Sequence, residues 1–270
     1  MSLDFTVPVA RTNERTARSP IERLARAAGA RFERHGGWNV AVAYGADAAL
    51  ETARISDTVG FCDRSALAKL DIQADPEVLS ELVSRVGGGI TLELGRASRA
   101  PDGATWWCPI TPSRLLVLSE PTSGWDVRAA VDGAAADAAG RFLTVADVSC
   151  GLAAMALVGP GANELLARFC AIDVRPAVTP VAAFRPGSVA RTPGYLLREG
   201  EERLLLLVGW ALGAYLWEVV ADAAASLGGG PVGCEALGVG AGGVGAGGVG
   251  AGAPLATDAE AGVGEGRANA

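Results

Sequence analysis

The sequence predicts an α+β fold in which helices pack on antiparallel sheets. Hydrophobic residues make up 50% of the 270 residues, enough to bury an extensive core. Helical and strand-like patterns follow one another without the regular alternation of a doubly wound parallel sheet. We expect this fold over residues 19–237, between a flexible arm at 1–18 and a disordered, glycine- and alanine-rich tail at 238–270.

Five helices are expected from capping residues and apolar spacing. In "SPIERLARAAGARF", Ser19 can cap a helix, Pro20 takes its first position and Glu22 completes a capping box. The same order of cap, proline and periodic apolar residues begins a second helix at Asp75, which Gly87 ends. The remaining helices are expected over 125–139, from Pro160 onward and over 212–227.

Short apolar and β-branched runs predict strands between these helices: "KLDI", "SRLLVLS", "FLTVADV", "AAMALV" and "ERLLLLV". Two segments also echo each other, because Asp63 and Ser65 open one strand-turn-helix unit and Asp147 and Ser149 open another. The serines lie 84 residues apart. This spacing predicts two related halves, at about 19–140 and 141–237, packed about a pseudo-twofold axis. Chance similarity between two such units is the alternative.

The segment "ALVGPGANELL", residues 156–166, runs from an apolar stretch through Gly-Pro-Gly into a helix and raises the question of a phosphate-binding loop. No Lys or Ser follows Gly159 and Gly161 at the spacing of a P-loop. A dinucleotide fingerprint would carry glycine where Glu164 stands, and Pro160 has no N–H to offer a phosphate. The pattern therefore favours a structural turn.

Charge and cysteine usage exclude several function classes. The net charge of −7 comes from 23 basic and 30 acidic residues without long runs of one sign, which argues against nucleic acid and anionic lipid as partners. Five cysteines share no CxxC spacing, so we expect no metal site and no disulfide framework, and reduced thiols in the cytoplasm. The uncharged run at 204–217 is too short for a membrane span, and the N-terminus lacks a signal-peptide pattern.

Residue patterns alone predict no catalytic residue. The single histidine, His35, has no recognisable nucleophile elbow beside it, so the pattern favours a core or surface histidine over a hydrolase. Six tryptophans could sandwich a flat ligand, but the position of Trp217 on a helix face favours packing for most of them.

Ordered motifs carry a family resemblance across residues 19–237. "GARFERHGGWNVAVAYG" followed by "LETARISDTVGFCDRS" resembles the N-terminal part of the glycine-cleavage T-protein, the tetrahydrofolate-dependent aminomethyltransferase. The second half is more similar to the gamma subunit of heterotetrameric sarcosine oxidase, through Cys170, Asp173, Pro176 and the closing Tyr215-Leu216-Trp217. The resemblance implies a folate-binding fold without the T-protein's third barrel domain, tetrahydrofolate as cofactor, and larger flavoprotein subunits as partners.

The same resemblance implies a folate site at Trp38, Arg191, Tyr195 and Glu199. Arginine suits a folate carboxylate, and glutamate suits the N–H edge of the pterin. The family's catalytic Asp-Asp pair is missing, and only Asp102 stands in the corresponding segment.

Three functions follow from these observations. The favoured one is an accessory, non-catalytic folate-fold protein of one-carbon metabolism, similar to the sarcosine oxidase gamma subunit. The alternatives are an active tetrahydrofolate-dependent aminomethyltransferase-like enzyme and a stand-alone scaffold whose tail tethers a partner.

Overall fold

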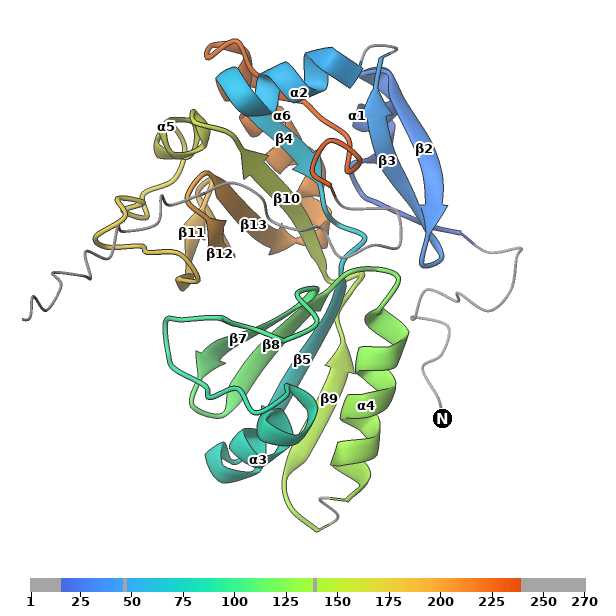
Figure 1. Cartoon of the computed structure of the whole chain (residues 1–270), viewed down its shortest axis with the longest axis vertical. Coiled ribbons are helices and arrows are strands. Elements are labelled where there is room, and N and C mark those ends of the chain that lie inside the picture. The colour runs from blue at the N-terminus through green and yellow to red at the C-terminus, as the bar shows by residue number, and fades with distance from the viewer. Residues whose placement is uncertain (1–15, 46–47, 138–139, 239–270) are drawn as a thin grey trace, which may run out of the picture.

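The computed structural model describes residues 16–45, 48–137 and 140–238. Most of the expected arm and, beyond residue 238, the expected tail therefore lie outside the described residues. The end of the arm is an exception, because Ala17–Arg18 forms strand β1, which pairs in parallel with β3 (Trp38–Tyr44). The described residues form two lobes, one above the other in Figure 1, each with a largely antiparallel sheet.

The lower lobe contains a five-stranded sheet in the order β6-β7-β8-β5-β9. Its strands are β5 (Ala68–Ala74), β6 (Ser98–Arg99), β7 (Thr105–Thr111), β8 (Arg114–Ser119) and β9 (Leu143–Asp147). Helices α3 (Pro76–Val86) and α4 (Gly124–Ala136) pack on it. Leu79, Leu82 and Val83 on the apolar face of α3 are buried in the same cluster as Ile72 of β5, as the helical spacing predicts.

The upper lobe contains a six-stranded sheet in the order β11-β12-β13-β10-β4-β14. Its strands are β4 (Gly60–Asp63), β10 (Leu152–Val158), β11 (Phe184–Val189), β12 (Thr192–Gly200), β13 (Arg203–Gly209) and β14 (Gly230–Pro231). Its helices are α5 (Ala162–Ala167) and α6 (Gly213–Ala225), the latter after a 3₁₀ turn at Trp210–Leu212. The alternating faces of β10 and β13 contribute to two different hydrophobic clusters, so this sheet is buried on both sides.

A small sheet, β1-β3-β2, lies at the side of the upper lobe with helices α1 (Glu22–Ala27) and α2 (Ala48–Asp57); β2 is Ala30–His35. The buried carboxylate of Glu51 on α2 links this sheet to the segment that follows β14. It accepts the N–H of Tyr44 at 2.6 Å and the N–H of Gly233 at 2.5 Å. The segment after β14 is thereby held against β3.

The two halves predicted from the sequence exchange one strand each, β4 and β9. Strand β4 precedes β5 in the chain but pairs with β10, whereas β9 precedes β10 and pairs with β5. The two places where the chain passes from one sheet to the other have equivalent hydrogen bonds. The residue before Ser65 donates its N–H to the carbonyl of Ala154 at 2.9 Å, and the Ser65 hydroxyl accepts the N–H of Ala154 at 3.1 Å. The residue before Ser149 donates to the carbonyl of Lys69 at 2.8 Å, and the Ser149 hydroxyl accepts the N–H of Lys69 at 3.0 Å.

This reciprocity gives the two Asp-x-Ser motifs equivalent hydrogen bonds in the structure. In both halves the aspartate carboxylate also accepts the serine N–H two residues later, at 2.9 Å for Asp63 and Ser65 and at 2.9 Å for Asp147 and Ser149. The matching hydrogen bonds on both sides of one junction favour a repeat over chance similarity of two strand-turn-helix units.

The predicted start of the first helix needs correction. Helix α1 begins at Glu22, and the Ser19 hydroxyl accepts the N–H of Ile21 at 3.0 Å, ahead of the helix. The Glu22 carboxylate binds Arg26 one turn later, at 2.9 Å, instead of reaching back to close a capping box. The reciprocal Glu22 half of the predicted capping box is therefore absent, and Glu22 forms an i, i+4 ion pair instead.

The Gly-Pro-Gly segment is a structural turn, as predicted. The N–H of Gly159 donates to the carbonyl of Glu202 at 3.0 Å, and the N–H of Gly161 donates to the carbonyl of Thr58 at 2.9 Å. Helix α5 begins at Ala162, two residues after Pro160. Both glycine N–H groups are thus bound by backbone oxygens and are not free for a phosphate.

Candidate functional site

A pocket of about 530 Å³, here called the central pocket, lies where the three sheets meet. Its walls come from the β2–β3 hairpin, the turn after β4, the β6–β8 part of the lower sheet, strands β12 and β13, and the turn at 234–238. The volume lies within the range of small-molecule sites. Apolar side chains form much of the wall, including Val40, Leu118 and Leu205.

Glycine in the β2–β3 hairpin brings His35 to this wall. Gly36 has a φ of +55°, and a Cβ atom there would lie 2.1 Å from the carbonyl oxygen of Pro121. Only glycine allows the hairpin to approach the loop after β8 so closely. The Nε2 atom of His35 is buried without a hydrogen-bond partner, 3.7 Å from a carboxylate oxygen of Glu33. His35 is therefore the pocket residue with an unsatisfied ring nitrogen.

Two arginines of the pocket are neutralised by glutamates. Arg64, which is buried in the turn after β4, forms an ion pair with Glu120 after β8. Arg203 on β13 binds Glu199 on β12, with Nε 2.9 Å from Oε2, and its guanidinium lies 3.5 Å from the carbonyl of Leu237. The Arg64–Glu120 pair joins segments 56 residues apart in the sequence, whereas Glu199 and Arg203 are only four residues apart, on neighbouring strands.

Asp102, which the sequence resemblance placed in the segment of the T-protein's catalytic aspartates, is hydrogen-bonded within its own turn. Its Oδ1 accepts the N–H groups of Ala104 at 2.8 Å and Thr105 at 3.0 Å. Its Oδ2 accepts the Thr105 hydroxyl at 2.8 Å. This carboxylate lines the central pocket, yet its lone pairs serve the turn between β6 and β7.

Arg99 differs from the other two pocket arginines. It lies opposite Trp106 in the β6–β7 pairing, and its guanidinium carbon lies 5.4 Å from the centre of the indole ring. Trp106 is buried, whereas Arg99 is exposed. Within the described part of the chain, no carboxylate lies at ion-pair distance from Arg99.

The four residues of the expected folate site do not converge on one cavity. Glu199 lines the central pocket. Trp38 and Tyr195 belong to the hydrophobic cluster behind its wall, where Trp38 packs against Trp210 at 5.9 Å between ring centres. Arg191 is exposed in the two-residue turn between β11 and β12, at a φ of +61°, and does not line the pocket.

Several pocket residues were not predicted from the sequence. Arg64, Arg99, Trp106, Glu120 and Arg203 reach the site from five separate segments. No motif spacing joins them, although each is a charged or aromatic side chain within or next to a strand. Arg64 offered the clearest signal, because it stands inside the Asp-x-Ser motif that the sequence singled out.

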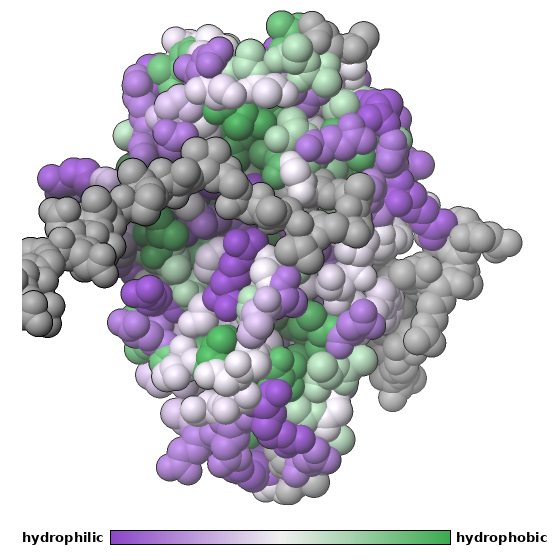
Figure 2. Space-filling view, in the orientation of Figure 1, coloured by the Kyte–Doolittle hydropathy of each residue, from purple (hydrophilic) through white to green (hydrophobic). Residues whose placement is uncertain are grey.

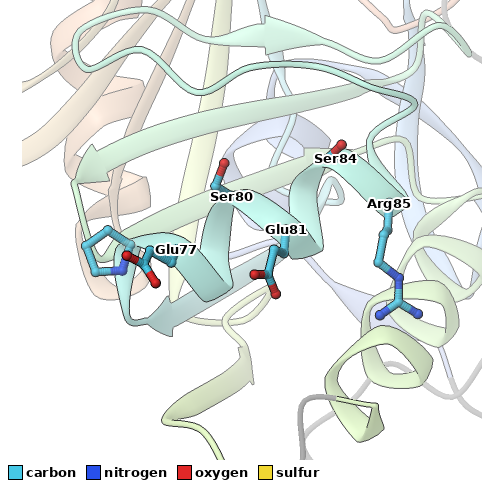
Figure 3. Close-up of a pocket in the computed structure, with 6 residues that line it drawn as sticks. Glu77, Ser80, Glu81, Ser84 and Arg85 are labelled. Atoms are coloured by element: carbon cyan, nitrogen blue, oxygen red, sulfur yellow. The ribbon is translucent and has the colours of Figure 1, made fainter.

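A second hollow, of about 710 Å³, lies beside α3 (Figure 3). All of its lining residues come from this one helix: Pro76, Glu77, Ser80, Glu81, Ser84 and Arg85. Glu81 is bound to Arg141 at 2.5 Å and Arg85 to Asp137 at 2.6 Å. This open helix face has no converging polar groups, so it is not a candidate site.

Within residues 16–45, 48–137 and 140–238, no group of His, Cys, Asp and Glu side chains is arranged to hold a metal ion. None of the helices in these ranges has the length and hydropathy that a membrane span requires.

Comparison with known proteins identifies the fold. No family model and no curated protein matches the chain. A chain of the heterotetrameric sarcosine oxidase from Corynebacterium sp. U-96, in complex with pyrrole 2-carboxylate, is similar with a TM-score of 0.61 and 21% identity, over 78% of this chain and 96% of that one. Aminomethyltransferase T of the glycine cleavage system from Bartonella henselae gives a TM-score of 0.64 and 17% identity, over 82% of this chain and 60% of that one.

These likenesses confirm the α+β fold expected from the sequence and its similarity to aminomethyltransferase T and to a sarcosine oxidase chain. At such identities they establish the fold alone. Function has to be argued from the central pocket and the surface around it.

Proposed function

We propose that the chain is an accessory, non-catalytic folate-fold protein of one-carbon metabolism, working in the cytoplasm beside a larger flavoprotein subunit. This proposal rests on the observation that the pocket carboxylates are bound by partners within the protein. Glu120 and Glu199 are each bound to an arginine, and Asp102 serves its own turn. A general acid or base has to be free to exchange a proton with the reacting group. Each of these three carboxylates is held by at least one partner within the protein.

The donor set of the central pocket suits a reduced folate, which when bound supplies the nitrogen atoms that carry a one-carbon unit. Glu199 uses Oε2 for Arg203, and its Oε1 has no hydrogen-bond partner among the described residues. That oxygen can accept from the N–H edge of a pterin. The walls at Val40, Leu118 and Leu205 offer apolar contact to its ring. Of the expected residues, Glu199 is thus the proposed direct contact, and Trp38 and Tyr195 support the wall.

An exposed apolar area supports a place in an assembly. Leu94, Val178 and Val181 are 56%, 45% and 37% exposed. Their loops adjoin, because Arg185 donates both to the carbonyl of Gly95 and to that of Val178. Figure 2 shows hydrophobic areas on the surface among hydrophilic side chains. Adjoining exposed apolar residues are typical of a protein-interaction surface.

The test is purification of the tagged full chain from its native cells. We expect a flavin-containing partner to copurify, detected by its visible absorbance. The double variant Leu94→Ser and Val178→Ser should lose this partner, whereas the control Leu50→Ser, which changes a side chain 59% exposed on α2, should retain it. Absence of any flavoprotein from the wild-type preparation would show the proposal to be wrong.

An active tetrahydrofolate-dependent transferase is the second candidate, and His35 favours it. Its buried Nε2 has no hydrogen-bond partner at the pocket wall, and a neutral imidazole nitrogen can accept a proton. If the purified chain alone transferred an aminomethyl group to or from tetrahydrofolate at an ordinary enzymatic rate, this second function would replace the first.

A further inference from the structure

We infer that Arg99 determines ligand specificity in the central pocket, by binding a carboxylate of an aromatic ligand. The inference rests on the proposed function, because it specifies how a folate-like molecule would be held. Its starting point is the difference between the three pocket arginines. Arg64 and Arg203 are occupied by Glu120 and Glu199, whereas Arg99 has no such partner in the described chain.

The indole of Trp106 orders the Arg99 side chain without using its hydrogen-bond donors. A guanidinium that lies over an aromatic ring keeps the N–H groups in its own plane available. The cross-strand pairing of Arg99 with Trp106 fixes this arrangement in the backbone. Arg99 is therefore ordered before a ligand arrives, so binding costs less side-chain entropy.

The charges around Arg99 leave it able to attract an anion. The other charged side chains of the pocket wall are Asp102, Glu120, Glu199, Arg64 and Arg203, together with the imidazole of His35. The two glutamates form ion pairs with Arg64 and Arg203, and the Asp102 carboxylate accepts three donors in its own turn. Arg99 is thus the cation at this wall whose charge is not balanced by a direct partner.

The position of Arg99 defines the class of ligand. Its side chain is exposed at the edge of the pocket, while the apolar side chains of Leu118 and Leu205 belong to the pocket wall. A ligand that fits both features has an aromatic body and a carboxylate at one end. Arginine binds carboxylates through two parallel N–H bonds, which lysine cannot reproduce.

The test compares three probes by titration calorimetry: tetrahydrofolate, aminobenzoylglutamate, which has the carboxylates without the pterin, and a methylated tetrahydropterin, which has no carboxylate. Arg99→Gln should weaken the two carboxylate-bearing probes about tenfold or more, because a charge-assisted contact is lost, and leave the tetrahydropterin unchanged. Arg99→Lys should fall between wild type and Arg99→Gln. The matched control is Arg23→Gln, an exposed arginine on α1 away from the pocket.

The outcomes separate this inference from the proposed function. If tetrahydrofolate does not bind but aminobenzoylglutamate binds through Arg99, the inference is supported and folate is excluded as the ligand. If tetrahydrofolate binds equally to wild type and to Arg99→Gln, folate is supported and the inference is overturned. Failure of all three probes to bind wild type overturns it as well. An unchanged thermal midpoint of Arg99→Gln shows that the variant is folded.

Discussion

Lys69 is the single lysine of the chain, and it is fully buried where the two halves meet. Its ammonium donates to the carbonyls of Ser65 and Leu67 at 2.8 Å each and of Ser149 at 3.3 Å. Burial lowers its pKa from 10.5 to about 7, although Asp63 nearby acts in the opposite direction. With one lysine in the sequence, isotope-labelled lysine gives a single NMR signal. We expect that signal to titrate near pH 7 in the folded protein.

The lowered pKa of Lys69 makes stability depend on pH with a defined sign. Between pH 7 and 10.5 the unfolded chain holds a proton on Lys69 that the folded chain has lost, so the free energy of unfolding rises with pH. The slope is about 1.4 kcal/mol per pH unit. Burial also raises the pKa of Cys62 and Cys108, so these thiols stay protonated in the folded protein. The thiols of the unfolded chain ionise at about pH 8.5, and above that pH the free energy of unfolding no longer rises but falls.

Urea unfolding of wild type and Lys69→Met at several pH values from 7 to about 8.5 therefore measures the contribution of Lys69. The rise should be present in wild type and absent from Lys69→Met. Equal slopes in the two proteins would contradict the lowered pKa.

At the scale of elements, strongly periodic segments were predictable and irregular ones were not. All five expected helices are present, at α1 and α3–α6, and so are the five expected strands, at β5, β8, β9, β10 and β13. Helix α2 was missed. Three of the missed strands carry residues that disfavour strands in isolation: Pro109 in β7, Pro186 and Gly187 in β11, and the charged Arg31, Glu33 and Arg34 in β2. These segments become strands because neighbouring strands pair with them, which local sequence does not encode.

The Gly-Pro-Gly turn connects β10 to α5 and lies against the end of α2. Its first glycine cannot be replaced without strain. Gly159 has a φ of +107°, and a Cβ atom there would lie 2.7 Å from the carbonyl oxygen of Ile55, near the end of α2. Gly159→Ala should therefore lower the free energy of unfolding by roughly 2 kcal/mol or more. The control is Gly133→Ala on α4, where the added Cβ meets no atom within 4 Å. That substitution should stabilise the protein by up to about 1 kcal/mol. Urea unfolding tests both, and an unchanged midpoint for Gly159→Ala would refute the strain.

At the scale of the whole molecule, the site was less predictable than the fold. Two residues were named from the same motif: Glu199 lines the central pocket, whereas Arg191 lies at a hairpin tip. A motif records which residues follow one another, but a pocket depends on which strands meet. Arg64 and Glu120 meet across 56 residues of sequence, and only the assembled sheets bring them together.

The exchanged strands also govern how the whole molecule folds. A fragment of residues 1–139 contains β4 without its partner β10, and its β5 lacks β9. A fragment of residues 140–270 contains β10 without β4, and its β9 lacks β5. Each fragment alone would leave a sheet edge and the buried Lys69 junction unformed, so we expect neither to unfold cooperatively. Coexpressed, the two should associate into a one-to-one complex, because only together do they complete both sheets. Size-exclusion chromatography and near-ultraviolet circular dichroism measure this. A cooperative unfolding transition of residues 1–139 alone would mean that the strand exchange is dispensable for folding.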